Sequence, residues 1–309
     1  VERYGKEQVK TWYFEVWNEP DIIYWHGTEA EYLKLYDYAV AGVRAALPEA
    51  KVGGPSTTGP GSEKASAYLD AFLRHCKNDK SAADGKAVPL DFVSFHPKGH
   101  PETVEGHVRM GLAAELKAAK AGFEIVAKYP QLRTLPIVLS EADPEGCAAC
   151  SMKVNPANAY RNGPLYATYT AAAIKGLFDL QDAAHVNLAG MLSWSFEFEG
   201  KEYFEGFRTL ATNGIDKPVL NVFRMAALMS GDRVEVSSSG RIATDLILTS
   251  GVRQAPDVDA LATTGEHQAA VMLWNYHDAE KAGETKAASV TVRALPKGVS
   301  RARLIHYRI

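Results

Sequence analysis

Residues 14–20 read FEVWNEP, an apolar run that ends abruptly in an amide, a carboxylate and a proline. Residues 11–17, TWYFEVW, are aromatic or β-branched apart from one glutamate, which is typical of a buried strand. Asn18 and Glu19 are poor strand residues, and Pro20 cannot donate a hydrogen bond to a neighbouring strand. The sequence therefore predicts a strand whose C-terminal end presents Asn18 and Glu19 side by side.

The pattern of a strand followed by a helix repeats along the chain, from residue 11 to about residue 230. Short apolar runs predict strands, and longer segments with apolar residues three or four positions apart predict helices. The predicted strands are 11–17, 50–54, 91–96, 136–141 and 188–196, and the predicted helices are 31–47, 63–76, 104–128, 163–183 and 219–230. Such alternation indicates an α/β fold with parallel strands, either an open doubly wound sheet or a closed (β/α)8 barrel.

The positions of the polar residues distinguish these two architectures. No glycine-rich phosphate-binding loop follows any of the predicted strands, which argues against a nucleotide-binding sheet. Polar residues recur instead at the strand ends, which carry Asn18 and Glu19, His96, Glu141, and Trp194 with the acids after it. Because chemistry on a barrel lies at the C-terminal ends of its strands, the sequence predicts a (β/α)8 TIM barrel.

The pattern changes at about residue 232, where short alternating segments are separated by turn residues. These segments are 233–236, 244–248, 258–263, 268–276 and 288–294. They predict an antiparallel β-sandwich that forms a separate accessory domain at residues 232–309, after a catalytic barrel domain at residues 1–231.

The composition is ordinary for a globular protein, with 309 residues of which 46% are hydrophobic and 23% are charged. The formal net charge of −3 provides no basic field, so we expect neither nucleic acid nor an anionic membrane as a partner. Cys147 and Cys150 form a CxxC motif, but no second CxxC or pair of nearby histidines completes a tetrahedral metal site. We therefore expect a loop disulfide or two free thiols, and no bound metal or other cofactor.

Two carboxylates at strand ends indicate acid–base chemistry on a bond that lies between them. Glycoside hydrolysis needs one carboxyl group to protonate the leaving oxygen, and a second to attack the anomeric carbon or to activate water. Glu19 and Glu141 lie on strands three positions apart in chain order, and a closed barrel can bring such strands across one mouth.

Four segments resemble motifs of glycoside hydrolase family 39, which contains β-xylosidases and α-L-iduronidases. They are FEVWNEPD at 14–21, SFHPKG at 94–99, PIVLSEAD at 136–143 and LSWSFEFEG at 192–200. The resemblance implies that Glu19 ends barrel strand four and Glu141 ends strand seven, which agrees with the three-strand interval counted above. It also implies that residues 1–231 hold strands four to eight. Strands one to three would be absent from this chain, which begins with Val1 and is interpreted as part of a longer protein.

The resemblance further implies a retaining exo-glycoside hydrolase that removes terminal xylose from β-1,4-xylo-oligosaccharides. Glu19 would act as the general acid and then as the general base, and Glu141 would be the nucleophile. Substrate-binding roles are implied for Asn18 on the sugar 2-hydroxyl, His96 on a hydroxyl or a carboxylate, and Trp194 as an apolar floor. An acid among Glu197, Glu199 and Glu202 is implied on outer hydroxyls, and Glu199 is favoured of the three.

Several alternatives stay open at this point. The same mechanism could act on an α-L-iduronide, an arabinoside or a β-glucoside, or the barrel could bind carbohydrate without catalysis. A uronic acid substrate would need a nearby cation, and the acid-rich mouth segments favour a neutral pentose. The xylosidases of the family carry a tyrosine soon after the nucleophile, whereas the next tyrosine here is Tyr160, and Asp143 is interpreted as a solvated loop acid or a cap. Oligomeric state and localisation (cytoplasmic, periplasmic or secreted) are not predicted.

Overall fold

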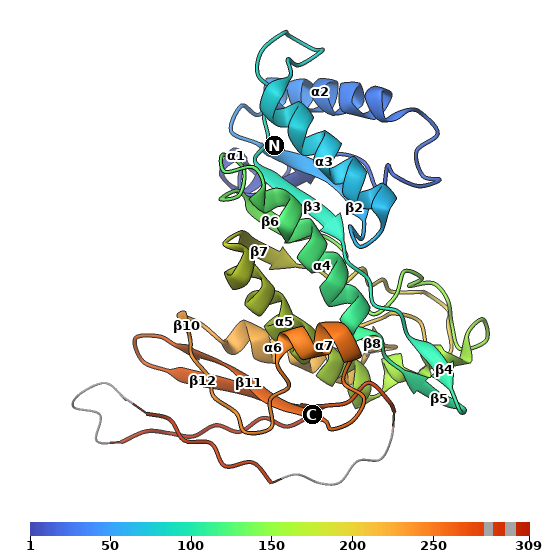
Figure 1. Ribbon diagram of the computed structural model, residues 1–309, viewed down its shortest axis with the longest axis vertical. Helices are drawn as coiled ribbons and strands as arrows, with labels where there is room; N and C mark the ends of the chain where they lie inside the picture. Colours follow the sequence, from blue (N-terminus) through green and yellow to red (C-terminus); the bar gives the residue numbers. More distant parts are fainter. Residues whose placement is uncertain (281–286, 294–300) are drawn as a thin grey trace.

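A five-stranded parallel sheet forms the centre of the molecule in the computed structural model, which describes residues 1–280, 287–293 and 301–309 (Figure 1). Its strands are β1 Tyr13–Glu15, β2 Lys51–Thr58, β3 Phe92–His96, β6 Pro136–Leu139 and β7 Asn187–Met191. Their order in the sheet is β1-β2-β3-β6-β7, and every neighbouring pair is parallel. Each connection therefore moves the chain by one strand in the same direction, as in the wall of a barrel.

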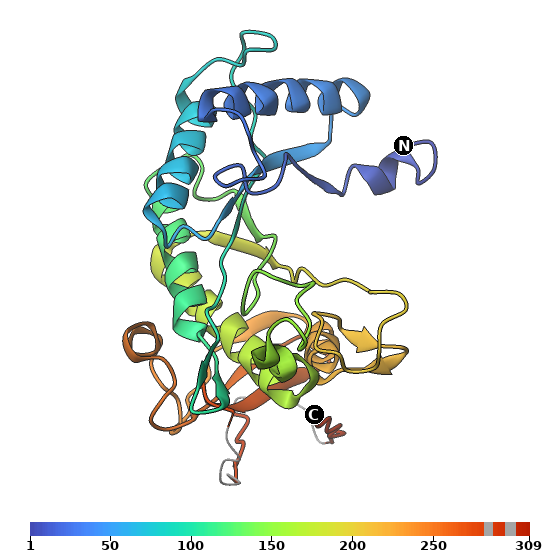
Figure 2. The same ribbon diagram turned by 90° about the vertical axis from the view of Figure 1, so that its right-hand side faces the viewer.

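Helices follow these strands as the periodicity predicts. They are α2 Glu29–Ala46, α3 Glu63–Asn78, α4 Leu112–Ala127, α5 Pro164–Ala184 and α6 Pro218–Leu228, after a short α1 Lys6–Val9. Helix α2 begins at a capping box, in which Thr28 accepts a hydrogen bond from the Glu31 backbone and Glu31 accepts one from Thr28. Figure 2 shows α3 (cyan) and α4 (green) on the same side of the strands, and α4 also packs against α5.

The predicted helix 104–128 begins later than expected, at Leu112. The preceding residues form an antiparallel hairpin of β4 Glu102–Val104 and β5 His107–Arg109. Its two turn residues, Glu105 and Gly106, both have a positive φ, which suits the turn that matches the twist of a two-stranded hairpin. The prediction from residue 104 was wrong because this turn was not recognised.

The end of β7 also differs from the prediction of a strand over 188–196. The strand stops at Met191, and residues 192–210 continue as a loop until the small antiparallel pair β8 Ala211–Thr212 and β9 Ile215–Asp216. Trp194 therefore lies just after the strand. A 3₁₀ helix, η1 Pro156–Asn162, similarly follows the loop after β6.

The core lies between the sheet and its helices and is closely packed. Helix α4 crosses β3 at Gly122, where an added Cβ would lie 2.4 Å from the ring of Phe95. Glycine is therefore required for this close approach of helix and strand. The same buried cluster extends from Phe95 through α5 to Trp274 and Tyr276.

From residue 232 the described chain forms three antiparallel strands, β10 Asp232–Val234, β11 Asp257–Thr264 and β12 Ala269–Tyr276. The predicted strand 244–248 was wrong, because this segment is the helix α7 Thr244–Ser250. A short apolar run does not distinguish the two periodicities. Residues 288–293 form no strand, and residue 294 lies outside the described residues. The β-sandwich is therefore not confirmed.

Strand β12 packs on α5 and α6, so the small sheet lies directly against the helices of the α/β part. The division of the chain between residues 231 and 232 stays a prediction. Within the described ranges, no helix has the combination of length and apolar character that would let it span a membrane.

Candidate functional site

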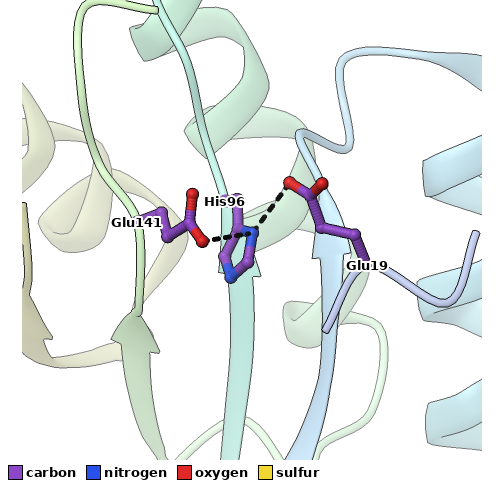
Figure 3. Close-up of side chains that lie close together, drawn as sticks. All are labelled: Glu19, His96 and Glu141. Atoms are coloured by element: carbon purple, nitrogen blue, oxygen red, sulfur yellow. Dashed lines mark hydrogen bonds and ion pairs between the residues drawn. The ribbon is translucent and has the colours of Figure 1, made fainter. Parts of the chain in front are cut away.

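Three predicted residues from the ends of three strands of the sheet converge on one point (Figure 3). Glu19 lies in the loop after β1, His96 is the last residue of β3, and Glu141 follows β6. The Nδ1 atom of His96 lies 2.9 Å from Oε1 of Glu19 and 3.8 Å from Oε1 of Glu141. One carboxylate oxygen from each glutamate and one ring nitrogen of His96 all lie within 4.8 Å of one another. The site is thus two carboxylates with an imidazole between them.

The loop after β1 has an unusual backbone that directs Glu19 towards the other two side chains. Trp17 and Glu19 both adopt a positive φ, of 70° and 44°, which is costly for residues with a Cβ. The Glu19 backbone N–H donates to the carbonyl of Ser56, 2.8 Å away, and this bond ties the loop to β2. Asp21, which is buried, accepts a further bond from the backbone of Thr58. Contacts with β2 therefore hold a strained conformation at the site.

The imidazole of His96 is buried and held on both of its nitrogens. Its Nε2 atom lies 2.9 Å from the hydroxyl of Ser56 and 3.1 Å from that of Ser140, and Ser140 donates in turn to Glu15. A hydrogen on Nδ1 can be donated to Glu19, while Nε2 accepts from Ser56. These contacts fix the orientation of the ring. The sequence does not reveal them, because Ser56 and Ser140 are far from His96 in the chain.

A lysine that the sequence analysis did not single out contacts the candidate nucleophile. The Nζ atom of Lys98 lies 2.8 Å from Oε2 of Glu141 and 3.0 Å from Oδ2 of Asp143. Lys98 lies only two positions after His96 in the SFHPKG segment, so its position after a strand end was a usable signal. The carboxylate of Glu141 thus presents one oxygen to His96 and the other to a cation.

Asp143 is fully buried, which corrects its interpretation as a solvated loop acid or a cap. Burial acts to raise its pKa, but Arg208 and Lys98 overcome this effect and hold the pKa below its usual range. Arg208 lies 3.0 Å away and is itself fully buried, and Ser193 and the backbone of Trp194 also donate to the carboxylate. Nothing in the local sequence indicated that Arg208 would reach this loop.

The remaining predicted residues surround this centre less closely. Asn18 is exposed directly beside Glu19, and Trp194 is 36% exposed with its ring against Phe196. Glu199 is exposed in the loop after β7 and lines a separate cavity together with Phe198 of that loop and Lys217, which directly precedes α6. Among the described residues, Glu199 makes no hydrogen bond or ion pair with Glu19, His96 or Glu141, so its role stays a prediction.

The loop after β6 decides two points that the sequence left open. Cys147 and Cys150 form a disulfide. The hydroxyl of Tyr160 donates to Glu145, 3.0 Å away, rather than to Glu141. Tyr160 therefore does not replace the tyrosine that was expected soon after the nucleophile.

The arrangement is suited to chemistry at a bond that enters between the two glutamates. Carboxyl groups about 5–5.5 Å apart allow direct attack by one of them, whereas a gap of about 6.5–9.5 Å leaves room for a water. One oxygen of Glu19 and one of Glu141 lie within 4.8 Å of one another, which is close to the shorter range and well below the longer one. The same two oxygens and the His96 nitrogen also form a donor set that a divalent metal ion could occupy.

Comparison with known proteins places this geometry in context. The model of the family described as "Glycosyl hydrolases family 39" matches residues 1–306. A β-xylosidase of Caldicellulosiruptor saccharolyticus is 27% identical over 289 residues, which cover 90% of this chain and 51% of that protein. The α-L-iduronidase of Mus musculus is 27% identical over 267 residues, covering 78% of this chain and 39% of that protein. The chain spans about half the length, or less, of the curated relatives it matches.

Solved structures show the same fold at lower identity. A bacterial orthologue of human α-L-iduronidase superposes with a TM-score of 0.67 and 23% identity, covering 90% of this chain and 45% of that one. A monomeric β-xylosidase from Caulobacter crescentus superposes with a TM-score of 0.62 and 21% identity, covering 87% of this chain and 48% of that one. These neighbours are (β/α)8 barrel enzymes, so the parallel sheet described here corresponds to part of a barrel of this type.

Proposed function

The chain belongs to glycosyl hydrolase family 39, and we propose that it is a retaining glycoside hydrolase in which Glu141 is the nucleophile and Glu19 the general acid and base. The observation that carries this proposal is the gap of at most 4.8 Å between a carboxylate oxygen of Glu19 and one of Glu141. A gap of this size suits direct attack on the anomeric carbon and leaves too little space for the water that inversion requires.

The reaction proceeds in two balanced steps. In the first, a Glu141 oxygen bonds to the anomeric carbon while Glu19 gives its proton to the leaving oxygen, and an aglycone alcohol departs. In the second, Glu19 removes a proton from water, whose oxygen displaces Glu141 from the anomeric carbon. Two inversions give overall retention. His96 holds Glu19 through Nδ1, and Lys98 holds the Glu141 oxygen that faces away from His96.

The first candidate substrate is a β-1,4-xylo-oligosaccharide, from which terminal xylose would be released. The similarity to curated β-xylosidases over most of this chain supports it. Asn18, exposed beside Glu19, would bind the sugar 2-hydroxyl, Trp194 would form an apolar floor, and Glu199 would bind hydroxyl groups further out.

The second candidate is a uronide, and a specific contact favours it. Lys98 is partly exposed and lies 2.8 Å from Glu141, so it provides a cation at the mouth. A uronic acid carboxylate needs such a partner. The expectation of a neutral pentose rested on an acid-rich mouth, and that expectation is weakened by Lys98. Curated α-L-iduronidases at similar identity also support this candidate.

Azide rescue tests the nucleophile. Glu141→Gly should lose hydrolysis of aryl glycosides with activated leaving groups, because no group remains to attack the anomeric carbon. Azide can enter the space left by the missing side chain, and should restore release of the aryl alcohol and give a glycosyl azide of inverted configuration. A Glu49→Gln variant, which removes an exposed carboxylate paired with Lys6, serves as the control. Undiminished activity of Glu141→Gly would refute the assignment, and a panel of aryl xylosides and uronides would identify the sugar.

A further inference from the structure

A row of alternating charges runs from the candidate nucleophile into the disulfide loop. Glu141 pairs with Lys98 at 2.8 Å, and Lys98 pairs with Asp143 at 3.0 Å. Asp143 pairs with Arg208 at 3.0 Å, and Arg208 pairs with Glu145 at 2.6 Å. Glu145 then pairs with Arg161, also at 2.6 Å. We call these six side chains the charge row: Glu141, Lys98, Asp143, Arg208, Glu145 and Arg161.

The charge row is balanced and largely shielded from water. It contains three carboxylates and three cations, and the side chains of Asp143, Arg208 and Arg161 have no exposed surface. Burial tends to raise the pKa of Glu145, but Arg208 and Arg161 hold it below its usual range. The carboxylates next to the arginines therefore stay ionised near neutral pH. Removing an inner member takes one ion-pair partner from each of its two neighbours and leaves the row with an unbalanced charge, so the positions of neighbouring members depend on one another.

The far end of the charge row is fixed to the disulfide loop by backbone carbonyls. Arg161 donates to the carbonyls of Cys147 and Cys150, at 2.7 and 2.9 Å, and to that of Gly206 at 3.0 Å. A disulfide between Cys147 and Cys150 holds these two carbonyls on one short loop, where a single guanidinium can reach both. Arg161 therefore depends on the loop conformation for its hydrogen bonds.

The loop and the nucleophile are also close in the chain. Glu141, Asp143, Glu145 and Cys147 alternate along one segment after β6, and Arg208 donates its backbone N–H to the carbonyl of Ala148 within the loop. A change in loop conformation would therefore act on Glu141 through the backbone as well as through Lys98. A displacement of about 1 Å in a reacting group can cost about 100-fold in rate.

We propose that Arg161 and Arg208 are positioning residues for Glu141, and that the Cys147–Cys150 disulfide locks the loop on which they depend. This inference rests on the proposed function, in which Glu141 is the nucleophile. The lock can be opened by a dithiol reductant, because Cys147 is exposed. The dithiol gives two electrons and two protons to the disulfide, its own sulfurs close into a ring disulfide, and Cys147 and Cys150 become thiols.

Dithiothreitol treatment of the 309-residue protein tests the lock. Thiols are counted in denaturant before and after treatment, and kcat and KM are measured on an aryl glycoside that the untreated protein hydrolyses. Reduction should raise the thiol count from one, Cys76, to three, and should lower kcat about tenfold with KM changed less than about twofold. A loss of folded protein would also lower the apparent kcat at unchanged KM, so circular dichroism before and after reduction must show that the fold is kept. The small change in KM then separates a displaced nucleophile from weakened substrate binding.

Cysteine variants provide the matched controls. Cys147→Ser/Cys150→Ser should reproduce the kcat of the reduced protein and ignore the dithiol. Cys76→Ser should keep the full response to the dithiol, because Cys76 is a buried free thiol outside the disulfide loop. Three thiols before treatment, or a broken disulfide with unchanged kcat, would overturn the proposal.

A charge variant keeps the test decisive if the reduced protein unfolds at the assay temperature. Glu145→Gln leaves both cysteines in place but removes the carboxylate that joins Arg208 to Arg161, so kcat should again fall about tenfold. Asp182→Asn is the control, because it removes a surface carboxylate paired with Arg233. Full kcat in folded Glu145→Gln refutes the positioning role. An active enzyme whose kcat does not respond to the dithiol would refute only the role of the disulfide. A protein that is inactive on every glycoside would also refute the proposed function.

Discussion

A carboxylate oxygen of Glu19 and one of Glu141 lie within 4.8 Å of one another, although the two residues end strands that are not neighbours in the sheet. β2 and β3 lie between their strands. The imidazole of His96, at the end of β3, lies between the two acids and contacts both. This separation is the quantity from which a retaining mechanism is inferred.

Removal of the acid should affect substrates according to their leaving groups. Glu19→Ala lacks the proton donor, so hydrolysis of a glycoside with a poor leaving group should fall by about 10²–10⁴-fold. A dinitrophenyl glycoside needs little proton assistance, so its first step should be much less impaired. Added azide should then give a glycosyl azide of retained configuration, because azide attacks the glycosyl-enzyme without a general base. Steady-state kinetics and product analysis measure both effects, and an equal loss for the two leaving groups would contradict the role of Glu19.

Substitution of Lys98 should distinguish the two candidate substrates. In Lys98→Met the Glu141 carboxylate loses its ion pair, so activity should fall on every glycoside. If the natural substrate is a pentoside, the loss should be similar for both assay substrates. The ratio of kcat/KM for aryl xylosides to that for aryl uronides should then be nearly the same in Lys98→Met as in the wild type. A charge-assisted hydrogen bond to a substrate carboxylate contributes about 1.5–3 kcal/mol, so a further loss of about 10- to 100-fold on uronides alone would favour the uronide.

Zinc ions should compete with the substrate at the site. Glu19, His96 and Glu141 offer two oxygens and one nitrogen within 4.8 Å of one another, a donor set that suits Zn²⁺. Zn²⁺ should raise KM without lowering kcat, EDTA should reverse the effect, and Mg²⁺ should have little effect at the same concentration. Metal analysis after dialysis should find less zinc on Glu141→Gly and unchanged zinc on the Cys147→Ser/Cys150→Ser variant. Inhibition that leaves KM unchanged would place the zinc elsewhere.

The buried acid Glu115 should make stability depend on pH. Burial raises its pKa from 4.5 to about 7, although the hydroxyl of Tyr169 donates to it and acts in the opposite direction. Between these two values the unfolded chain has lost the proton and the folded chain keeps it, so stability falls as pH rises. The free energy of unfolding of the wild type, relative to Glu115→Gln, should therefore fall by up to about 3 kcal/mol between about pH 4 and 8. Urea unfolding of both proteins at the two pH values measures this, and a constant difference would contradict it.

Much of the α/β part followed from local pattern. Strand and helix periodicities predicted the five parallel strands and the helices after them, and the polar residues at strand ends predicted Glu19, His96 and Glu141 as neighbours. These predictions succeeded because parallel strands that follow one another in the same direction must end at one edge. The prediction of a strand at 244–248 failed because a short apolar run fits either periodicity. The predicted start of α4 was too early because the hairpin turn before it was not recognised.

The sequence by itself determined which acids, imidazole and tryptophan stand at the strand ends, because residue type and alternation are local properties. Only the tertiary structure decided that Asp143 is buried, that Lys98 pairs with Glu141, and that Arg208 reaches back to the loop after β6. These contacts join residues from separate strand ends and loops. The pairing of a charge depends on the register of its strand and on how far water is excluded around it, and neither can be read from the neighbouring residues in the chain.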